Sequence, residues 1–72
     1  MGTKNNPGKF DCYENADPDE PMFILLARDG DAPALVEKWA NEREARDGNT
    51  PKVQEARTCA ANMRAWRQSH RK

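Results

Sequence analysis

Three arginines near the C-terminal end of the sequence are spaced by seven residues. Arg57, Arg64 and Arg71 would lie on one face of a helix, because seven residues make almost two helical turns. Guanidinium groups bind phosphates through paired hydrogen bonds, so the row predicts a site for an anionic ligand such as a nucleotide. The alternative interpretation is a solvated face whose positive charges favour a helix C-terminus. The residues expected to contact such a ligand are Arg28, Arg57, Arg64, Arg67, Arg71 and Tyr13.

Acidic side chains gather around the most apolar part of the sequence. Neighbouring carboxylates can bind a divalent metal or act as acid and base in catalysis. The calcium-loop pattern is absent, however, and three of the five residues are of the type that begins helices. We therefore predict neither a metal site nor a catalytic site here. The five residues are Asp17, Asp19, Glu20, Asp29 and Asp31.

The two cysteines and the single histidine also predict no active site. Cys12 and Cys59 are far apart in the sequence, and His70 lies near its end. This spacing fits neither a zinc site nor a nucleophile with its base. Phosphate-loop and dinucleotide motifs are absent as well. We expect a non-enzymatic protein that uses no metal and no cofactor.

No targeting or membrane segment is expected. The first residues, MGTKNNPGKF, lack the apolar stretch of a signal peptide, and no run approaches the roughly 20 apolar residues of a membrane span. The sequence therefore predicts a reduced, cytoplasmic protein without a membrane partner.

Charge is unevenly distributed along the chain, although its formal net charge is zero. Residues 1–20 hold two lysines and five acids, whereas residues 49–72 hold six basic residues and one acid. This asymmetry indicates either pairing within the chain or an anionic partner. Few aromatic residues are interleaved with the basic ones, which argues against a nucleic acid as that partner.

Two long helices are predicted to position these residues. Apolar residues recur at spacings of three and four over Pro51–Ser69, and proline suits the first turn of a helix. A second helix is expected over Ala32–Asp47, capped by Asp31 and ended by Gly48. The short connection favours an antiparallel hairpin. Trp39 and Trp66, on the apolar stripes of the two helices, are interpreted as core, with stacking on a ligand base as the alternative.

The run Met22–Ala27 is the longest continuous apolar stretch. The preceding Asp-Pro-Asp-Glu-Pro favours a short helix over about Glu20–Arg28, and a buried strand is the alternative. Two flanking helices cannot cover such a run, so it is either the centre of the domain or a subunit interface. The residues assigned to an interface are Met22, Phe23, Ile24, Leu26 and Trp39.

The predicted fold is all-α: a small helical domain with an antiparallel helical hairpin, preceded by a short helix and an extended N-terminal arm. We assign residues 1–16 to the arm and residues 17–72 to the helical domain. Hydrophobic residues make up 36% of the chain and charged residues 33%, so its core is small. Small domains with lean cores often depend on association, and we therefore predict a homo-oligomer.

The stretch FDCYENADPDEPMFILLARDGDAPALVEKWANERE, residues 10–44, resembles a family of short proteins encoded by bacteriophages and prophages. Its members share an Asp-Cys-Tyr segment, then Asp-Glu-Pro-Met-Phe, Leu-Leu-Ala-Arg-Asp, Ala-Pro and Trp-Ala. The resemblance covers about half of the chain and implies a small accessory protein in the host cytoplasm. Proteins of this size and setting often counter host defences or adjust host machinery.

Two functions fit these observations. In the first, the protein binds a host protein through its apolar run or its acidic front and so antagonises a defence system. In the second, an oligomer binds an anionic nucleotide signal through the arginines of the last helix. The resemblance fits both functions equally, so the choice rests on chemistry, and we favour protein binding narrowly.

Overall fold

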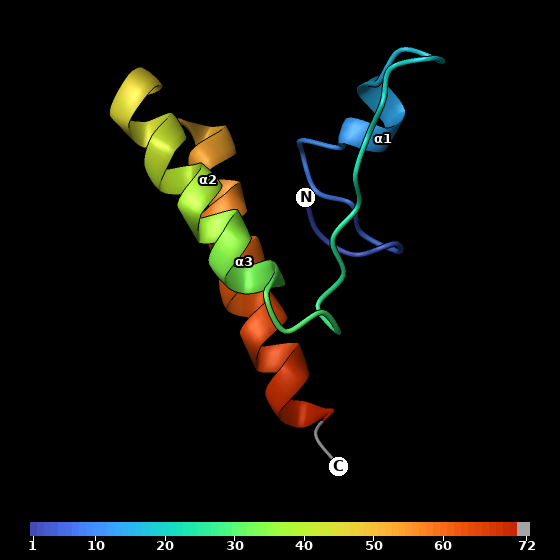
Figure 1. The fold of residues 1–72 in the computed structure, drawn as a ribbon, viewed down its shortest axis with the longest axis vertical. Helices are drawn as coiled ribbons and strands as arrows, with labels where there is room; N and C mark the ends of the chain where they lie inside the picture. The colour runs from blue at the N-terminus through green and yellow to red at the C-terminus, as the bar shows by residue number, and fades with distance from the viewer. Residues whose placement is uncertain (71–72) are drawn as a thin grey trace.

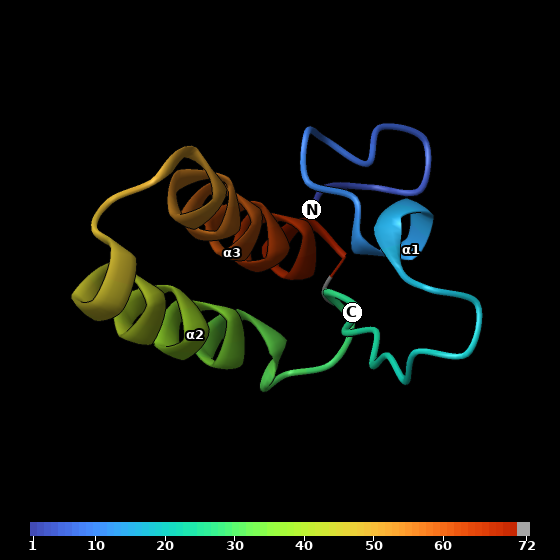
Figure 2. The ribbon, with the colours of Figure 1, turned by 90° about the horizontal axis from the view of Figure 1, so that it is seen from above.

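Two long antiparallel helices lie side by side, and the first 31 residues lie along one side of them (Figures 1 and 2). The computed structural model describes residues 1–70. It contains α1 (Cys12–Asn15), α2 (Ala32–Asp47) and α3 (Pro51–Ser69). Every regular element of the described residues is a helix, so the predicted all-α hairpin preceded by a short helix is confirmed. No helix within these residues is long and apolar enough to cross a membrane.

Local signals set the connection between α2 and α3. Gly48 has a φ of 83°, which glycine adopts without strain, and its N–H donates to the Glu44 carbonyl at 2.8 Å. The Thr50 hydroxyl accepts from the N–H of Val53 at 3.2 Å and caps α3, whose first residue is Pro51. These ends agree with the predicted bounds of both helices.

The start of α2 differs from the prediction in one contact. Asp31 occupies the cap position, but its side chain makes no capping hydrogen bond. Its backbone is helical, with φ −89° and ψ −12°, whereas a capping side chain usually needs an extended backbone. Asp29 makes the hydrogen bonds at this end of the helix instead. Its Oδ1 accepts from the Asp31 N–H at 3.0 Å, and its carbonyl accepts from the Ala32 N–H at 3.1 Å.

The short helix predicted over Glu20–Arg28 is wrong. Residues 21–26, which we call the extended segment, have no regular secondary structure. Residues 17–20 instead form a turn, in which the Glu20 N–H donates to the Asp17 carbonyl at 3.1 Å and the Glu20 carboxylate accepts from the Asp17 N–H. Pro21 favours an extended residue before it, and two turns of helix are marginal without packing on several sides.

The short helix lies earlier, within the arm that was expected to be extended. Asp11 begins α1 by accepting from the Tyr13 N–H at 3.1 Å, and Ala16 ends it. The following Asp17-Pro18 pair cannot continue the helix easily, because a residue before proline disfavours helical geometry. One capped turn is therefore the whole of this element.

The core between the long helices is made of small side chains. Ala40, Val53 and Ala56 form a buried cluster, against which Met1 and Val36 pack. The stripe predicted on α3 is confirmed in its buried part. The buried hydrophobic residues are Ala32, Ala40, Val53, Ala56 and Ala60.

The prediction that the two tryptophans belong to the core is wrong. Trp39 is 36% exposed and Trp66 is 43% exposed. Helices that meet through alanines approach closely and leave no volume for indole rings between them. Trp66 instead stacks on His70, with ring centroids 3.9 Å apart and planes 11° from parallel.

One carboxylate holds the N-terminal arm against α3. Glu55 accepts from the Met1 ammonium at 2.9 Å and from the backbone N–H groups of Lys9 and Phe10 at 3.1 Å each. Hydrogen bonding to the ammonium, followed by the two backbone donors, lowers the pKa of Glu55. Phe10 is half-buried beside this contact, whereas Tyr13, in α1, is 73% exposed.

We expect Ala60→Leu to destabilise the protein by about 1–3 kcal/mol, because the added carbons must enter a fully buried position between packed helices. Ala60 is fully buried on α3, and the neighbouring Ala61 is exposed on the same helix. Ala61→Leu is therefore the matched control and should change stability little. Urea unfolding followed by circular dichroism measures both; equal effects would contradict a close-packed seam.

We also expect stability to fall in acid through Glu55. A carboxylate whose pKa is lower in the folded state stabilises that state above its unfolded pKa, about 4.3, and loses the contribution as the pH falls through the folded pKa. Glu55→Gln should therefore flatten the decline in unfolding free energy between about pH 5 and pH 3. Part of the decline should remain, because the pKa of Glu37 is lowered too. An unchanged profile would show that the arm contact contributes nothing.

Candidate functional site

Two arginines of the predicted row, Arg57 and Arg64, bind side chains of α2 and remain partly exposed to solvent. Arg64 holds both carboxylate oxygens of Glu37, with Nη2 to Oε1 at 2.7 Å. Arg57 donates to the side chains of Asn41 at 2.9 Å and Glu44 at 3.2 Å. The hydrogen bonds between Arg64 and Glu37 raise the pKa of Arg64 and lower that of Glu37. Two of the arginines predicted to bind phosphate, Arg57 and Arg64, are thus already paired with carboxylates of α2.

Two arginines still share a hollow near the C-terminal end of α3. Its volume is about 450 Å³, and the start of α2 forms its other wall. The Arg67 Nη1 donates to the Arg28 carbonyl at 2.8 Å, which joins α3 to the turn before α2. Tyr13 lines a different hollow, and Arg71 lies outside the described residues. The lining residues are Gly30, Pro33, Ala34, Arg64, Arg67 and Gln68.

Titratable groups elsewhere are spread over separate elements. Cys12 begins α1, while His70 follows α3 and is stacked on Trp66 at the far end of the molecule (Figure 1). Cys59 is partly buried on α3, and desolvation raises the pKa of its thiol. Within residues 1–70, no three histidine, cysteine or acidic side chains lie together in a way that would hold a metal ion.

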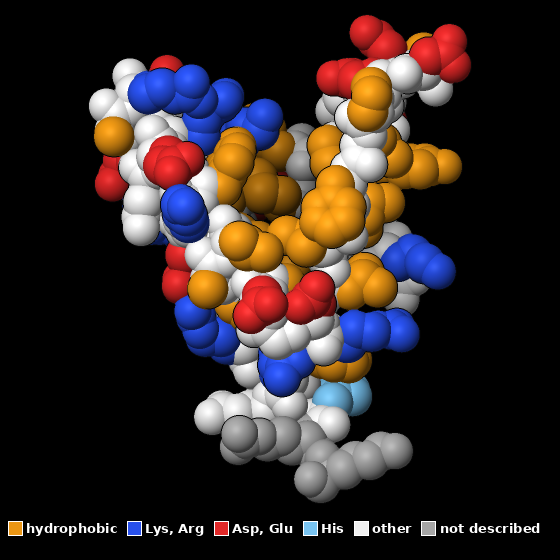
Figure 3. All heavy atoms as spheres, viewed as in Figure 1, with side chains coloured by type: hydrophobic (Ala, Val, Ile, Leu, Met, Phe, Trp, Pro, Cys, Tyr) orange, Lys and Arg blue, Asp and Glu red, His pale blue; other side chains and the backbone are white. Residues whose placement is uncertain are grey.

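Large hydrophobic side chains gather on one face, over the extended segment and the adjoining side of the hairpin (Figure 3). Phe23 is the most exposed of them, at 83%. All five residues that were assigned to an interface are exposed, as a contact surface requires; the contact itself stays a prediction. The exposed large hydrophobic residues are Tyr13, Met22, Phe23, Ile24, Leu26, Leu35, Trp39 and Trp66.

Trp39 is the centre of a distinct group on α2, which we call the Trp39 site. The Arg43 guanidinium lies 5.4 Å from the centroid of its rings, and the Lys52 ammonium of α3 lies 5.9 Å from it. Both distances fit cation–π attraction. Arg43 also pairs with Asp47 at 3.3 Å, whereas Lys52 makes no ion pair within the described part of the chain. Leu35, one helical turn earlier, is exposed too.

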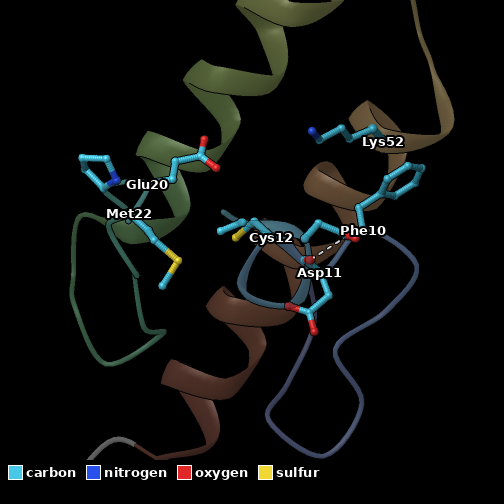
Figure 4. Close-up of a pocket in the computed structure, with 9 residues that line it drawn as sticks. Phe10, Asp11, Cys12, Glu20, Met22 and Lys52 are labelled. Atoms are coloured by element: carbon cyan, nitrogen blue, oxygen red, sulfur yellow. Dashed lines mark hydrogen bonds between the residues drawn. The ribbon is translucent and has the colours of Figure 1, made fainter. Parts of the chain in front are cut away.

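Lys52 connects the Trp39 site to a hollow of about 290 Å³ (Figure 4). In this hollow, Lys52 and Phe10 lie on one side, Glu20 and Met22 on the other, and Cys12 between them. The Glu55 anchor fixes Phe10, and the turn at residues 17–20 places Glu20 and Met22. Two carboxylates, Asp11 and Glu20, also line the hollow, and Lys52 is the basic group of its lining. The arrangement can accept an apolar side chain beside Phe10 and Met22, and Lys52, on the side of Trp39, can pair with an acidic group of a partner.

A second apolar hollow lies between the arm, the extended segment and the hairpin. It also measures about 290 Å³. Phe23, Ile24 and Leu25 form one wall, and Val36 of α2 with Met63 of α3 form part of the other. The extended segment therefore crosses over this hollow instead of filling it.

Sequence reasoning did not identify Arg43, Lys52 or Phe10 as part of a site. One signal was present, because Arg43 follows Trp39 by four residues and such pairs meet on a helix surface. No local pattern marks Lys52, which reaches Trp39 only through the packing of α3 on α2.

Comparisons with known proteins give no match for this chain. No protein-family model matches the chain, and searches of curated proteins and of solved structures find no significant similarity.

Proposed function

We propose that the protein is a small, non-enzymatic binding protein that docks on a protein of the host cell. In the phage setting that the sequence resemblance implies, it acts in the host cytoplasm and antagonises a defence system. The observation that carries the proposal is the Trp39 site, where a partly exposed tryptophan lies within cation–π distance of Arg43 and Lys52 and connects through Lys52 to a hollow. Tryptophan and arginine are enriched among the residues that dominate protein interfaces.

The chemistry of the Trp39 site favours a partner with an apolar anchor and a nearby carboxylate. The anchor would enter the hollow beside Phe10 and Met22, and the carboxylate would pair with Lys52, which makes no ion pair within residues 1–70. Desolvated charge pairs at an interface favour the partner that complements them and penalise one that does not. The partner class is therefore a protein surface with mixed apolar and acidic character.

The alternative function, an oligomeric binder of a nucleotide signal, rests on the hollow that Arg64 and Arg67 share. Its position beside the start of α2 adds the positive end of a helix dipole. A phosphate would have to displace Glu37 from Arg64, however, and that carboxylate is held through both oxygens. Protein binding therefore remains the function that we favour.

We expect Trp39→Ala to abolish capture of the host partner. Trp66→Ala is the matched control, because it removes a similarly exposed tryptophan from a different part of the hairpin. Tagged wild-type and variant proteins are incubated with bacterial host lysate, and the captured proteins are identified by mass spectrometry. A protein retained by the wild type and by Trp66→Ala, but lost with Trp39→Ala, supports the proposal.

The affinity for the purified partner should then fall by about 2 kcal/mol or more, roughly 30-fold, in Trp39→Ala. Circular dichroism shows whether the variant keeps its helices. Identical captured proteins for all three chains would exclude the Trp39 site as the docking surface.

For the alternative function, calorimetric titration with a panel of cyclic and linear nucleotides gives a clear answer. If the hollow binds phosphate, Arg67→Ala should weaken binding about tenfold or more, since a charge-assisted contact contributes roughly 1.5–3 kcal/mol. Glu37→Gln should strengthen binding, because it releases Arg64. Arg46→Ala, on the far end of α2, is the control. No heat at millimolar nucleotide would end this hypothesis.

A further inference from the structure

One row of side chains along α2 reaches the surface from end to end. Its members recur every four residues, so they form a ridge on the helix, which we call the α2 ridge. Its first member keeps helical register, because the Asp31 carbonyl accepts from the Leu35 N–H at 3.1 Å. The ridge spans about 18 Å, roughly three helical turns. It consists of Asp31, Leu35, Trp39 and Arg43.

The α2 ridge has an acid at one end, a base at the other and two exposed apolar side chains between them. Asp31 makes no capping hydrogen bond, and it makes no ion pair within the described residues. Arg43 pairs with Asp47, but exposed pairs of this kind contribute little. Lys52 adds a second cation beside Trp39. Both ends therefore offer charge to a partner.

A ridge of this kind fits a helix better than a strand. Two helices pack when the ridge of one lies in the groove between ridges of the other. A strand docks mainly through hydrogen bonds of its backbone to an exposed backbone edge. The backbone groups of α2 are bonded within the helix, so the ridge presents side chains alone.

We infer that the host partner docks a helix on the α2 ridge, through a row of one basic, two apolar and one acidic side chain. The base meets Asp31, and the acid lies beside Arg43 and Lys52. The apolar pair packs on Leu35 and Trp39. Complementary charge at both ends fixes the register of the two helices and penalises a partner with like charges there.

This inference rests on the proposed function and names the structural class of its partner. The acid of the docked helix is the carboxylate that the proposed function pairs with Lys52. Because Lys52 borders both Trp39 and the hollow beside Phe10, the proposed apolar anchor would follow this acid into the hollow.

Selection from a displayed library of random peptides tests the class of partner; about 18 residues allow three or more helical turns. Immobilised wild-type protein is the bait, and peptides that bind Trp39→Ala equally well are removed. Enriched peptides should share basic, apolar, apolar and acidic residues at spacings of three or four. Enrichment of alternating apolar residues, or no enrichment over the Trp39→Ala background, would overturn the inference.

Charge exchange tests the register, with one enriched peptide titrated by fluorescence anisotropy. Asp31→Lys should weaken binding about tenfold, because it opposes the basic residue of the peptide. A peptide with Glu in place of that base should bind Asp31→Lys more tightly than it binds the wild type. Asp19→Lys, the same change at an exposed position of the turn at residues 17–20, is the matched control and should have no effect.

A second variant guards against loss of structure at the start of α2. Asp31→Asn removes the charge but keeps a residue type suited to the cap position, so α2 should persist by circular dichroism. It should weaken binding in the same direction as Asp31→Lys, to a smaller extent. Unchanged affinity in both variants would overturn the inference.

A proline at the centre of the peptide tests its conformation. It should abolish binding, because proline breaks a helix, and equal binding by this peptide would overturn a helical partner. Sedimentation equilibrium at about 100 µM tests whether a second copy covers the ridge instead. Any self-association should be unaffected by Asp31→Lys, and a dimer that this variant dissociates would overturn the inference. A host protein captured through Trp39, without a helical pattern among the enriched peptides, would support host binding and exclude the helix.

Discussion

The contact between α2 and α3 is made of alanines, and the rest of the structure depends on the small size of these side chains. Ala40, Ala56 and Ala60 let the two helices approach closely, so the seam is well packed but small. Larger hydrophobic side chains find no volume there. The tryptophans and the residues of the extended segment are therefore left on the surface, where they are available for contacts with other molecules.

Polar pairs at the edge of this seam fix how the helices align. Glu37 and Glu44 of α2 bind Arg64 and Arg57 of α3, and the two pairs run in opposite chain directions, as an antiparallel hairpin requires. Exposed pairs of this kind add little stability each, but they disfavour a shifted register in which like charges would meet. The Glu55 anchor then ties the arm to α3, and through Phe10 it positions the hollow beside the Trp39 site.

The sequence predicts the parts of this fold that local chemistry controls. Gly48, Thr50 and Pro51 define the hairpin connection because their conformational preferences act within a few residues. The extended segment was mistaken for a helix because its backbone depends on what lies beside it, which no local pattern contains. The arginine row shows a third case. Its spacing of seven predicts either a ligand site or a solvated face, yet Glu37 and Glu44 have the same spacing on the neighbouring helix, and matching the two rows would have indicated internal pairing.

The packed contact between the helices is small and the exposed apolar surface is large, so binding of a partner would affect the stability of the fold. Any partner that binds only the folded chain stabilises it by mass action, and the gain grows with the partner's concentration relative to its dissociation constant. Within residues 1–70 the buried hydrophobic residues are four alanines and Val53, so that gain is large relative to what the core alone supplies. The same exposed side chains that weaken the isolated fold thus become its stabilising contacts in a complex. A partner that covers such a surface would stabilise the fold, which is the physical basis of the proposal that the protein is a binder.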